Sequence, residues 1–391
     1  MTMKAVILAA GEGRRLKPLT NLRPKPMIPI ANRPLLEHVV TAVVEAGVTE
    51  IVLVVGYKRE RIQSYFGDGE EWNVDISYAI QDKQLGTGHA ILQAEEFVDD
   101  DFLALNGDRI IESDVVRALI ERHEGDGETL LAVTPTDRPT DYGVVELRGD
   151  RVTNIVEKPR WGRPRSELIN AGVYCFEQSI FDEIRATDSG PGGESSIVTT
   201  IGRLIEDGGV RGIRSRGMWI DVSNLWDVLG VNSSALDQAE SSVGTGFHRS
   251  SGAEIGDGVQ IGDDCRVGHN ATIGRGTAIG DNVTVGANAV VSNAVVLSDS
   301  IIDDGAVVRD CIVAGNSYVG PNVTVEGGTA DLVVEEEYYE DVTLGGVVGD
   351  NARVGGGVYV EPGSIIGNSA RVAGGATVTG RVPPHAEVRR G

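Results

Sequence analysis

The sequence predicts an α/β protein with a doubly wound, mostly parallel sheet, followed by a left-handed parallel β-helix. Apolar runs alternate with amphipathic segments in the first part of the chain, which is typical of strands alternating with helices. In the last part an aliphatic residue recurs every six positions, which is typical of a β-helix. The length of 391 residues also exceeds what one core normally organises. We expect a first domain at residues 1–235, a linker at 236–251 and the β-helix at 252–391.

The elements of the first domain are predicted from short runs bounded by turn-forming residues. Strands are expected at residues 5–9, 51–55, 76–80 and 102–105, and helices at 35–46, 58–66 and 88–96. From about residue 130 to 225 the pattern becomes richer in strands. Because ligands of doubly wound sheets bind at the carboxyl ends of the strands, the loops after Ala9 and Leu105 are the expected binding loops.

The six-residue repeat predicts the β-helix directly. One flat face is one hexapeptide, three faces form a coil, and stacked coils bury their aliphatic residues in a continuous core. Between residues 297 and 345 the period survives only in part, and residues 335–341 are expected to form an extruded loop. The repeating residues are Ile255, Ile261, Val267, Ile273, Ile279, Val285 and Val291, and then Val348, Val354, Val360, Ile366, Val372 and Val378.

The charge balance excludes two classes of partner. The chain has 58 acidic and 35 basic side chains, and its net charge of −23 argues against binding to nucleic acid or to an anionic membrane. The acidic residues are spread along the chain, and only six of the basic residues are Lys. Such a surface suits a halophilic protein, because at about 1 M salt charge repulsion is screened within about 3 Å.

Nothing in the sequence predicts export, a membrane span or a zinc site. There is no run of 18 apolar residues, and the chain leads from Met1 into a strand pattern without a signal peptide, so we expect a cytoplasmic protein. Cys175, Cys265 and Cys311 are widely spaced, form no CxxC motif and are expected to be reduced packing residues. The six His show no ligand spacing either.

The loop after the first strand combines two glycines with a cluster of cations. Gly11 and Gly13 would let backbone N–H groups approach a phosphate. A Walker A loop is excluded because no GK[ST] follows, and a dinucleotide-binding turn is excluded because Leu16 stands at the third glycine position. In an acidic protein this loop indicates a polyphosphate ligand, with a solvated basic loop as the alternative. Its cations are Arg14, Arg15, Lys17, Arg23 and Lys25.

The motif Gly11-x-Gly13-x-Arg15-Leu16-x-Pro18-x-Thr20, followed by Pro24-Lys25-Pro26-Met27, closely resembles the signature of the sugar-1-phosphate nucleotidylyltransferases, such as the glucose-1-phosphate thymidylyl- and uridylyltransferases. The resemblance extends over about the first 230 residues and implies a Rossmann-like nucleotidyltransferase sheet. Arg14 departs from the usual Thr or Ser, and Val222-Ser223 replaces the usual Xaa-Gly. The other matching segments are Gln81, Leu85-Gly86-Thr87-Gly88-His89-Ala90, Asn106-Gly107-Asp108, Tyr142-Gly143, Glu157-Lys158-Pro159, Asn170-Ala171-Gly172 and Trp219-Ile220-Asp221.

The resemblance implies a role for each matched residue. Catalysis would depend on Arg15, Lys25, Asp108 and Asp221, with the two aspartates as ligands of Mg²⁺, the expected cofactor. The nucleotide would be bound by Leu8, Ala10, Gly11, Gly13, Arg15, Lys25, Gln81, Gly86 and Thr87. The sugar phosphate would be bound by Asn106, Gly143, Glu157, Lys158 and Asn170. An ordinary turn, a solvated polar group or a surface ion pair is the alternative for individual residues, and His89 is expected to be structural.

The chemistry of such a reaction needs no general base. A sugar-1-phosphate is already an anionic nucleophile, so positioning and charge neutralisation provide the rate. We therefore expect transfer of a nucleoside monophosphate from UTP or dTTP to a hexose- or aminohexose-1-phosphate, with release of pyrophosphate. The sequence leaves the choice of base and of sugar open.

The chain as a whole resembles the archaeal bifunctional enzymes that form UDP-N-acetylglucosamine. This leaves two roles for the β-helix: acetyl transfer to glucosamine-1-phosphate, or assembly of a homo-oligomer, with a trimer favoured. The segment at residues 314–320 resembles the acetylation region but contains no His to act as a base, and Asp331 stands where Asn is expected. His269 or His248 of a neighbouring subunit is the remaining source of a base. We favour assembly, since the acids Glu335, Glu336, Glu337, Glu340 and Asp341 would repel the phosphates of coenzyme A.

Overall fold

The computed structural model describes residues 3–123, 128–159, 165–190, 193–215, 217–335 and 337–390. The chain forms two compact units. The first contains Met1–Glu12, Pro24–Met27 and Leu35–Asp221, and the second contains Gly13–Arg23, Ile28–Pro34 and Val222–Gly391. Across the described residues, no helix is both long and apolar enough to cross a membrane.

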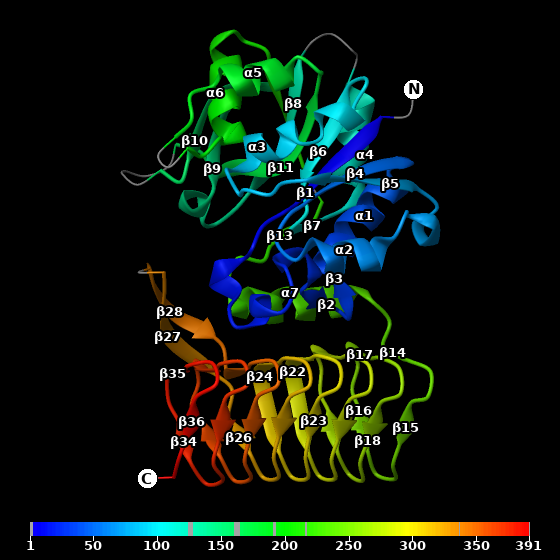
Figure 1. Ribbon diagram of the computed structural model, residues 1–391, viewed down its shortest axis with the longest axis vertical. Coiled ribbons are helices and arrows are strands. Elements are labelled where there is room, and N and C mark those ends of the chain that lie inside the picture. The colour runs from blue at the N-terminus through cyan, green and yellow to red at the C-terminus, as the bar shows by residue number, and fades with distance from the viewer. Residues whose placement is uncertain are drawn as a thin grey trace. The chain divides into compact units, whose positions relative to one another are not determined.

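The first unit is built around a nine-stranded sheet (Figure 1). β5, β4, β1 and β6 run parallel to one another, as do β8 and β12. β11 is antiparallel to β6 and β8, and β10 is antiparallel to β12 and β9. The predicted α/β fold is confirmed, and the strand-rich region after residue 130 supplies the antiparallel strands. In spatial order the strands are β5 (Asp75–Ile80), β4 (Glu50–Val55), β1 (Lys4–Ala9), β6 (Phe102–Asn106), β11 (Leu168–Phe176), β8 (Thr129–Pro135), β12 (Val210–Arg214), β10 (Arg151–Glu157) and β9 (Gly143–Arg148).

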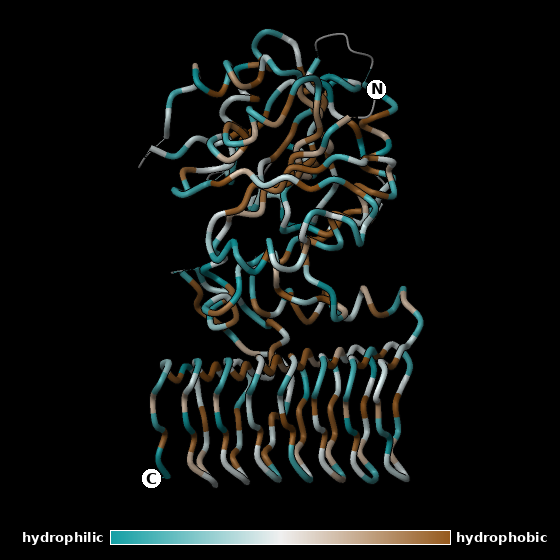
Figure 2. Tube along the Cα trace, turned by 45° about the vertical axis from the view of Figure 1, so that its right-hand side comes forward, coloured by the Kyte–Doolittle hydropathy of each residue, from teal (hydrophilic) through white to brown (hydrophobic). Residues whose placement is uncertain are grey.

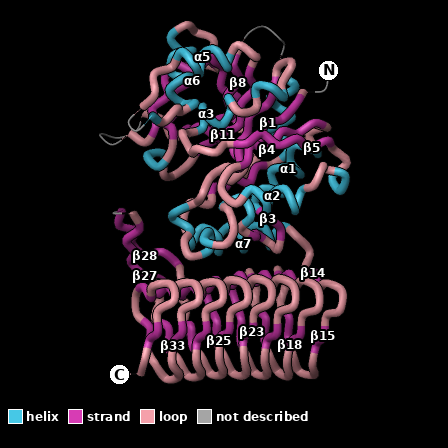
Figure 3. The backbone as a smooth tube through the Cα atoms, viewed as in Figure 1, coloured by secondary structure: helices cyan, strands magenta, loops and turns pink. Residues whose placement is uncertain are grey.

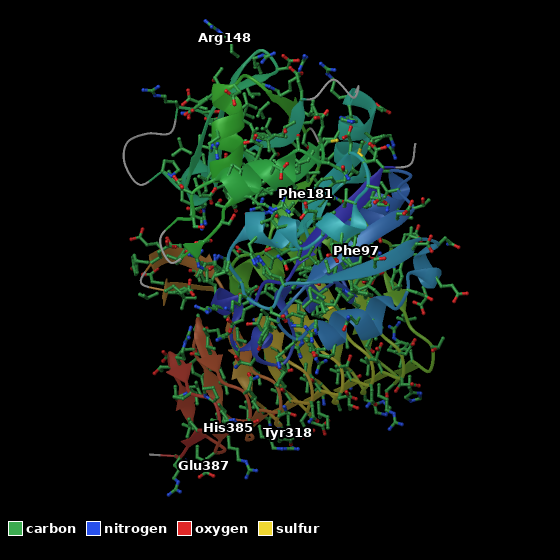
Figure 4. All side chains as sticks on the ribbon, turned by 45° about the horizontal axis from the view of Figure 1, so that its top comes forward. Phe97, Arg148, Phe181, Tyr318, His385 and Glu387 are labelled. Atoms are coloured by element: carbon green, nitrogen blue, oxygen red, sulfur yellow. The ribbon has the colours of Figure 1, made fainter. Side chains whose placement is uncertain are left out.

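Helices cover both faces of this sheet. Ala5 and Ile7 of β1 pack with α1 (Leu35–Glu45), α2 (Arg59–Phe66) and α4 (Ser113–Arg122), whereas Val6 packs with α3 (Thr87–Leu92), α5 (Ile180–Ala186) and α6 (Ile197–Glu206). Figure 2 shows hydrophobic residues gathered along the strands inside this unit. Phe181 of α5, labelled in Figure 4, stacks on Phe102 with ring centroids 5.4 Å apart. Because both faces are buried, β1 is apolar from Ala5 to Ala9.

The second unit is dominated by short parallel strands that stack as the coils of the predicted left-handed β-helix (Figure 3). Val267, Val285, Ile302, Val319 and Val354 follow one another in a single ladder within the buried core. The step from Val267 to Val285 is 18 residues, or three hexapeptides, but the step from Val285 to Ile302 is 17. The period therefore weakens in the middle of the repeat because a turn loses one residue, while the coils continue. The helix runs from β14 (Ser242–Val243) to β36 (Glu387–Val388).

The segment expected to be an extruded loop is a β-hairpin instead. Antiparallel β27 (Thr329–Val334) and β28 (Glu337–Thr343) are inserted between β26 (Thr324–Val325) and β29 (Gly346–Val348). Leu332 pairs with Tyr339 and Val333 with Tyr338, and such cross-strand pairs of aliphatic and aromatic residues favour this pairing. Glu336, which was expected to contribute to repulsion of coenzyme A, lies outside the described residues.

The compact units differ from the domain division expected from the sequence. Helix α7 (Leu225–Gln238) and the ribbon of β2 (Pro29–Ile30) and β3 (Arg33–Pro34) belong with the β-helix. Leu236 packs with Ala31 and Ala278 in a small core, and buried Asn232 joins Ala31 N to Gly276 O at 2.9 and 3.0 Å.

The expected linker at residues 236–251 is likewise ordered. It contains the end of α7, then β14, which pairs with β17 (Val259–Ile261), and β15 (His248–Arg249), which pairs with β18 (Arg266–Val267). The physical reason is that the first coil needs these strands to cover its open end.

Candidate active site

Three charged residues singled out by the sequence meet in the first unit. Lys25 Nζ lies 2.7 Å from Asp108 Oδ2 and 3.8 Å from Asp221 Oδ1. Lys25 belongs to a 3₁₀ turn, Lys25–Met27; Asp108 follows β6; and Asp221 ends β13 (Trp219–Asp221). The cluster therefore joins segments from three distant parts of the sequence.

Strand pairing places the two aspartates. Leu8 of β1 pairs with Asn106 of β6, and Gly107 N donates a hydrogen bond to Leu8 O at 2.9 Å. A Cβ added at Gly107 would lie 2.9 Å from that same oxygen, so a side chain there would force the turn apart. β13 pairs with β7 (Arg109–Ile111) so that Asp221 stands opposite Arg109, one residue beyond Asp108.

Electrostatics keep Asp108 ionised. Burial by itself raises the pKa of Asp108, but Lys25 and Arg109 outweigh burial and hold the pKa below its usual range. The Asp221 side chain is 6% exposed and the Asp108 side chain is 34% exposed. Asp108 is thus the carboxylate that a ligand reaches from solvent, and Asp221 supports it from inside.

Arg109 is a member of the cluster that the motifs did not single out. Its Nε lies 3.7 Å from Asp221 Oδ1, and its guanidinium packs over the rings of Trp219 and Tyr142 at 5.2 and 5.9 Å. Burial lowers the pKa of Arg109, but Asp221 and Asp108 offset burial and raise the pKa overall. A basic residue directly after the Asn106-Gly107-Asp108 turn, in a chain this acidic, was the available signal.

Two of the predicted sugar-phosphate residues surround Gly172. A Cβ added at Gly172 would lie 2.4 Å from Asn106 Nδ2 and 2.6 Å from Arg109 Nη1, and its φ of 75° also favours glycine. Asn170 is oriented by two hydrogen bonds, donating from Nδ2 to the Tyr174 hydroxyl at 2.7 Å and accepting at Oδ1 from Gly172 N at 2.9 Å. Asn106 and Asn170 therefore border the same close-packed turn as Arg109.

Gly143 and Glu157 form a second contact with Asn170. A Cβ added at Gly143 would lie 2.9 Å from Glu157 Oε2 and 3.5 Å from Asn170 Cβ. Burial raises the pKa of Glu157, with Lys158 and Arg109 opposing that rise. Lys158 itself follows β10 in a left-handed conformation, with its N donating to Tyr142 O at 3.0 Å. The five predicted sugar-phosphate residues thus lie on β6, β9, β10 and β11, at or next to strand ends.

The expected base-recognition segment is held as a rigid loop. Gln81 is 4% exposed, and its Nε2 donates to Gly86 O at 3.2 Å and lies 2.9 Å from His89 Nδ1. Gly86 has a φ of 95°, and a Cβ there would lie 2.4 Å from the Ser195 carbonyl.

The same loop packs on the segment before α6 and on the first binding loop. Thr87 Oγ1 accepts a hydrogen bond from Ile197 N at 3.1 Å, and Ala10 O accepts one from Gln84 Nε2 at 2.9 Å. The partners Ser195 and Ile197 carry no motif, so sequence patterns could not indicate them.

The two glycines of the glycine-rich loop, Gly11 and Gly13, differ in their packing and in their backbone conformation. Among the described residues, no atom lies within 4 Å of a Cβ built at Gly11, so packing within the protein does not require glycine there. Gly13 has a φ of 70°, and its carbonyl accepts a hydrogen bond from Thr20 Oγ1 at 2.9 Å. Arg15 lies in the part of the loop that belongs to the second unit, where its Nε lies 2.9 Å from Glu335 Oε2.

Asp108 and Asp221 suit a hard divalent cation. Both already approach one positive group, the Lys25 ammonium, at 2.7 and 3.8 Å, so their oxygens point to the same small region. Mg²⁺ takes one or two carboxylates and completes its shell with water and phosphate oxygens. Among the described residues, no group of three or more His, Cys, Asp or Glu could enclose a metal by itself. The residues therefore fit a Mg²⁺ ion bound together with its phosphate ligand.

A doubly wound sheet, with one aspartate just after β6 and a second at the end of β13, has the features of a nucleotide-handling transferase. The nucleotidyl transferase family model matches residues 4–238, and the chain belongs to this family. A model of the GMPPB C-terminal domain matches residues 254–343, and one of the hexapeptide repeat of succinyl-transferase matches residues 346–380.

Curated relatives resemble the chain over about three fifths of its length. The bifunctional protein GlmU of Methanococcus maripaludis strain C5 is 42% identical over 242 residues, or 62% of this chain and 56% of that protein. The chain thus spans little more than half the length of the GlmU relatives it matches. The low-salt glycan biosynthesis nucleotidyltransferase Agl11 of Haloferax volcanii is 36% identical over 60% of this chain and 66% of its own.

Two further similarities concern thymidylyltransferases. The glucose-1-phosphate thymidylyltransferase of Streptomyces antibioticus is 36% identical over 247 residues, covering 62% of this chain and 68% of that one. A solved structure of a Bacillus anthracis protein, described as a candidate glucose-1-phosphate thymidylyltransferase in complex with a sucrose, matches with a TM-score of 0.56 and 26% identity. It covers 60% of this chain and 95% of its own.

Proposed function

We propose that the protein transfers a nucleoside monophosphate from UTP or dTTP to a hexose- or aminohexose-1-phosphate and releases pyrophosphate. The observation that carries the proposal is the cluster of Lys25, Asp108 and Asp221, which gathers one cation and two carboxylates at strand ends. The names of the thymidylyltransferase and GlmU relatives support a sugar-phosphate substrate.

The reaction is a single displacement at phosphorus. An oxygen of the sugar-1-phosphate forms a bond to the α-phosphorus, the bond from that phosphorus to the oxygen bridging to the β-phosphate breaks, and pyrophosphate leaves with the electron pair. No proton has to be removed, because the nucleophile is already ionised. Lys25 would steady the α-phosphate, and Arg15 would grip the β- and γ-phosphates, as a guanidinium does bidentately.

The remaining site residues would bind and orient the two substrates. The backbone at Leu8, Ala10, Gly11 and Gly13 would face the nucleotide, with Gln81, Gly86 and Thr87 shaping the pocket for its base. Asn106, Gly143, Glu157 and Asn170 would bind sugar hydroxyls, and Lys158 would bind the sugar phosphate. Holding both reactants in line is worth several kcal/mol to such a reaction.

Asp108 and Asp221 would hold Mg²⁺. When bound, the ion neutralises charge on the phosphate oxygens as a Lewis acid. Without it, Lys25 and Arg109 together offset the charges of the two carboxylates, which keeps the site from repelling the triphosphate.

We propose that the β-helix supports assembly, with a trimer favoured, rather than acetyl transfer. In the segment at residues 314–320, Gly315 N donates to Asp350 Oδ1 at 3.1 Å and Asn316 Nδ2 donates to Asn351 Oδ1 at 2.7 Å. Both groups serve the stacking of coils, and Asn cannot accept the proton of a sugar ammonium. The acidic, Lys-poor composition suits work in concentrated salt, in the cytoplasm.

One assay tests this function. Four nucleoside triphosphates and dTTP are each combined with several sugar-1-phosphates in about 2 M KCl, where screening lengths are a few Å, and pyrophosphate release is followed with and without Mg²⁺. Release from a pyrimidine triphosphate only with Mg²⁺ is the expected result, and no release from any pair contradicts the proposal. A parallel arm measures thiol release from acetyl-CoA with glucosamine-1-phosphate. Steady release there would make the enzyme bifunctional.

A further inference from the structure

The hairpin of β27 and β28 contacts the arginine expected to bind the triphosphate. Arg15 Nε donates to Glu335 Oε2 at 2.9 Å, and Arg15 Nη2 lies 3.8 Å from Glu337 Oε2. All three residues belong to the second unit. Hydrogen bonding to Glu335 is the largest of the effects that raise the pKa of Arg15. The β-helix thus supplies a partner to the glycine-rich loop.

The hairpin is itself held in place. The Tyr339 ring contacts the Trp226 ring of α7 with centroids 4.9 Å apart. Across the two strands, Asp331 accepts hydrogen bonds from the Tyr338 hydroxyl at 2.9 Å and from Asp341 N at 3.0 Å. Glu335, which directly follows β27, is therefore presented from a braced hairpin.

The other end of the same loop segment is also joined to the β-helix. The guanidinium of Arg23 pairs with Asp350, whose side chain is 3% exposed and which also accepts from Gly315 N. Residues 13–23 are thus held at Arg15 and at Arg23 by carboxylates of the coils and their hairpin.

We propose that Glu335 is a positioning residue for nucleotidyl transfer, which acts by orienting the Arg15 guanidinium toward the β- and γ-phosphates. This inference rests on the proposed function. Glu335 takes the Nε–H of Arg15, whereas the contact at Nη2 is longer than a hydrogen bond. Among the residues that the structure describes, no carboxylate therefore pairs bidentately with the Nη edge, which presents the forked donors that match phosphate oxygens.

This arrangement gives the β-helix a part in binding the nucleotide. A carboxylate across both Nη groups would compete with the triphosphate, but one at Nε fixes the direction of the fork and lowers the entropy lost when phosphate binds. The effect should fall on binding of the nucleotide and not on binding of the sugar phosphate.

The test compares Glu335→Ala, Glu335→Gln and a matched control, Glu340→Ala, which removes an acid from the same hairpin. Steady-state kinetics are measured for both substrates in the full-length protein, with thermal melting to confirm folding. Losing one charged hydrogen bond should raise KM for the triphosphate about tenfold, with kcat and KM for the sugar phosphate nearly unchanged. In Glu335→Gln, KM for the triphosphate should stay close to the wild-type value, because the amide oxygen still accepts the hydrogen bond from Arg15 Nε. In Glu340→Ala, KM for the triphosphate should equal the wild-type value.

A double-mutant cycle separates positioning from other effects. In an Arg15→Ala background, Glu335→Ala should have no further effect, because Glu335 acts through Arg15. An unchanged or lowered KM in Glu335→Ala would overturn the proposal, a lowered value meaning that the carboxylate competes with phosphate. An additive effect in the Arg15→Ala background would also overturn it. A wild-type protein without activity would instead refute the proposed function.

Discussion

Arg23 and Lys25 are two residues apart, yet each pairs with a carboxylate of a different unit. Lys25 pairs with Asp108 in the first unit, where the Asp108 side chain is 34% exposed. Arg23 pairs with Asp350 in the second, where the Asp350 side chain is 3% exposed. Both are pairs of a cation and an aspartate, but solvent reaches the first carboxylate and not the second.

The difference in exposure separates a pair that can exchange partners from one that cannot. An exposed carboxylate can bind an incoming cation at little desolvation cost, whereas a buried one must keep its partner. Asp350 is further fixed by a hydrogen bond from Gly315 N to its Oδ1. We propose that the Lys25–Asp108 pair belongs to the active site, whereas the Arg23–Asp350 pair attaches residues 13–23 to the β-helix.

Truncation of the chain before the β-helix should have the largest effect on both pairs. A chain ending after Ala239 keeps α7 but loses Ala278, against which Leu236 packs, and loses the partners of Arg15 and Arg23. We expect a poorly soluble fragment with pyrophosphate release reduced by about 10³-fold or more, because uncovered apolar surface and a loosened loop act together. A soluble fragment with wild-type kcat/KM in the same assay would refute this.

Removing the negative charge of Asp108, which pairs with Lys25, should have the next largest effect. In Asp108→Asn, kcat should fall about 100-fold or more, because metal-assisted charge neutralisation is worth several kcal/mol. The variant should remain folded, which its melting curve checks. Asp75→Asn, at an exposed position on β5, is the control and should keep full turnover. Undiminished turnover in Asp108→Asn would remove the metal assignment.

Breaking the anchored pair should affect stability before chemistry. Asp350→Ala leaves the Arg23 charge without its buried partner and should lower the free energy of unfolding by about 3 kcal/mol. The matched control is Asp237→Ala, since Asp237 pairs with a largely exposed Arg275 and its loss should cost about 0.5 kcal/mol or less. Chemical denaturation checks both, and equal losses in the two variants would show that burial does not distinguish them.

The smallest expected effect concerns two acids of the first unit, Glu157 and Asp108, whose pKa values shift in opposite directions. Burial raises the pKa of Glu157, so the Glu157 carboxyl stays protonated to higher pH in the folded state than in the unfolded state. The protein therefore loses stability as the pH rises through the folded-state pKa of Glu157. Asp108 has a lowered pKa, so its contribution is present at neutral pH and is lost only in acid. Glu157→Gln should therefore melt roughly 1 °C higher than wild type at pH 7, with no difference near pH 3.5. Melting curves at the two pH values decide this, and a lower melting temperature at pH 7 would reverse the sign.

Patterns in the sequence were sufficient for the parts of the fold that repeat. The strands at residues 5–9 and 51–55 were predicted because a doubly covered sheet requires apolar runs, and the coils because each needs one inward aliphatic residue. The period failed near residue 297 because a coil with one residue fewer still stacks, so side chains stay in register in space while the spacing in sequence changes. The hairpin that follows was misread as a loop, since its many acids hide a strand pattern.

The candidate site divides in the same way. Sequence motifs contain Lys25, Asp108 and Asp221. The neighbouring turns need glycine at Gly107 and Gly172, where a side chain would clash, and these glycines are part of the motifs. Arg109, in contrast, belongs to the cluster because β7 pairs with β13, and Glu335 faces Arg15 because a hairpin 320 residues away in sequence is braced by Trp226. No local pattern encodes such pairs.

By itself the sequence determined the two architectures, the glycine-rich loop and the charged residues that its motifs contain, because local periodicity and turn chemistry are written in consecutive residues. Only the tertiary structure decided which unit each segment joins. Residues 13–23, 28–34 and α7 resemble parts of the first domain in sequence, but they pack with the coils because Leu236, Asn232 and Arg23 find their buried partners there. Burial of distant groups, and not spacing along the chain, fixes that choice.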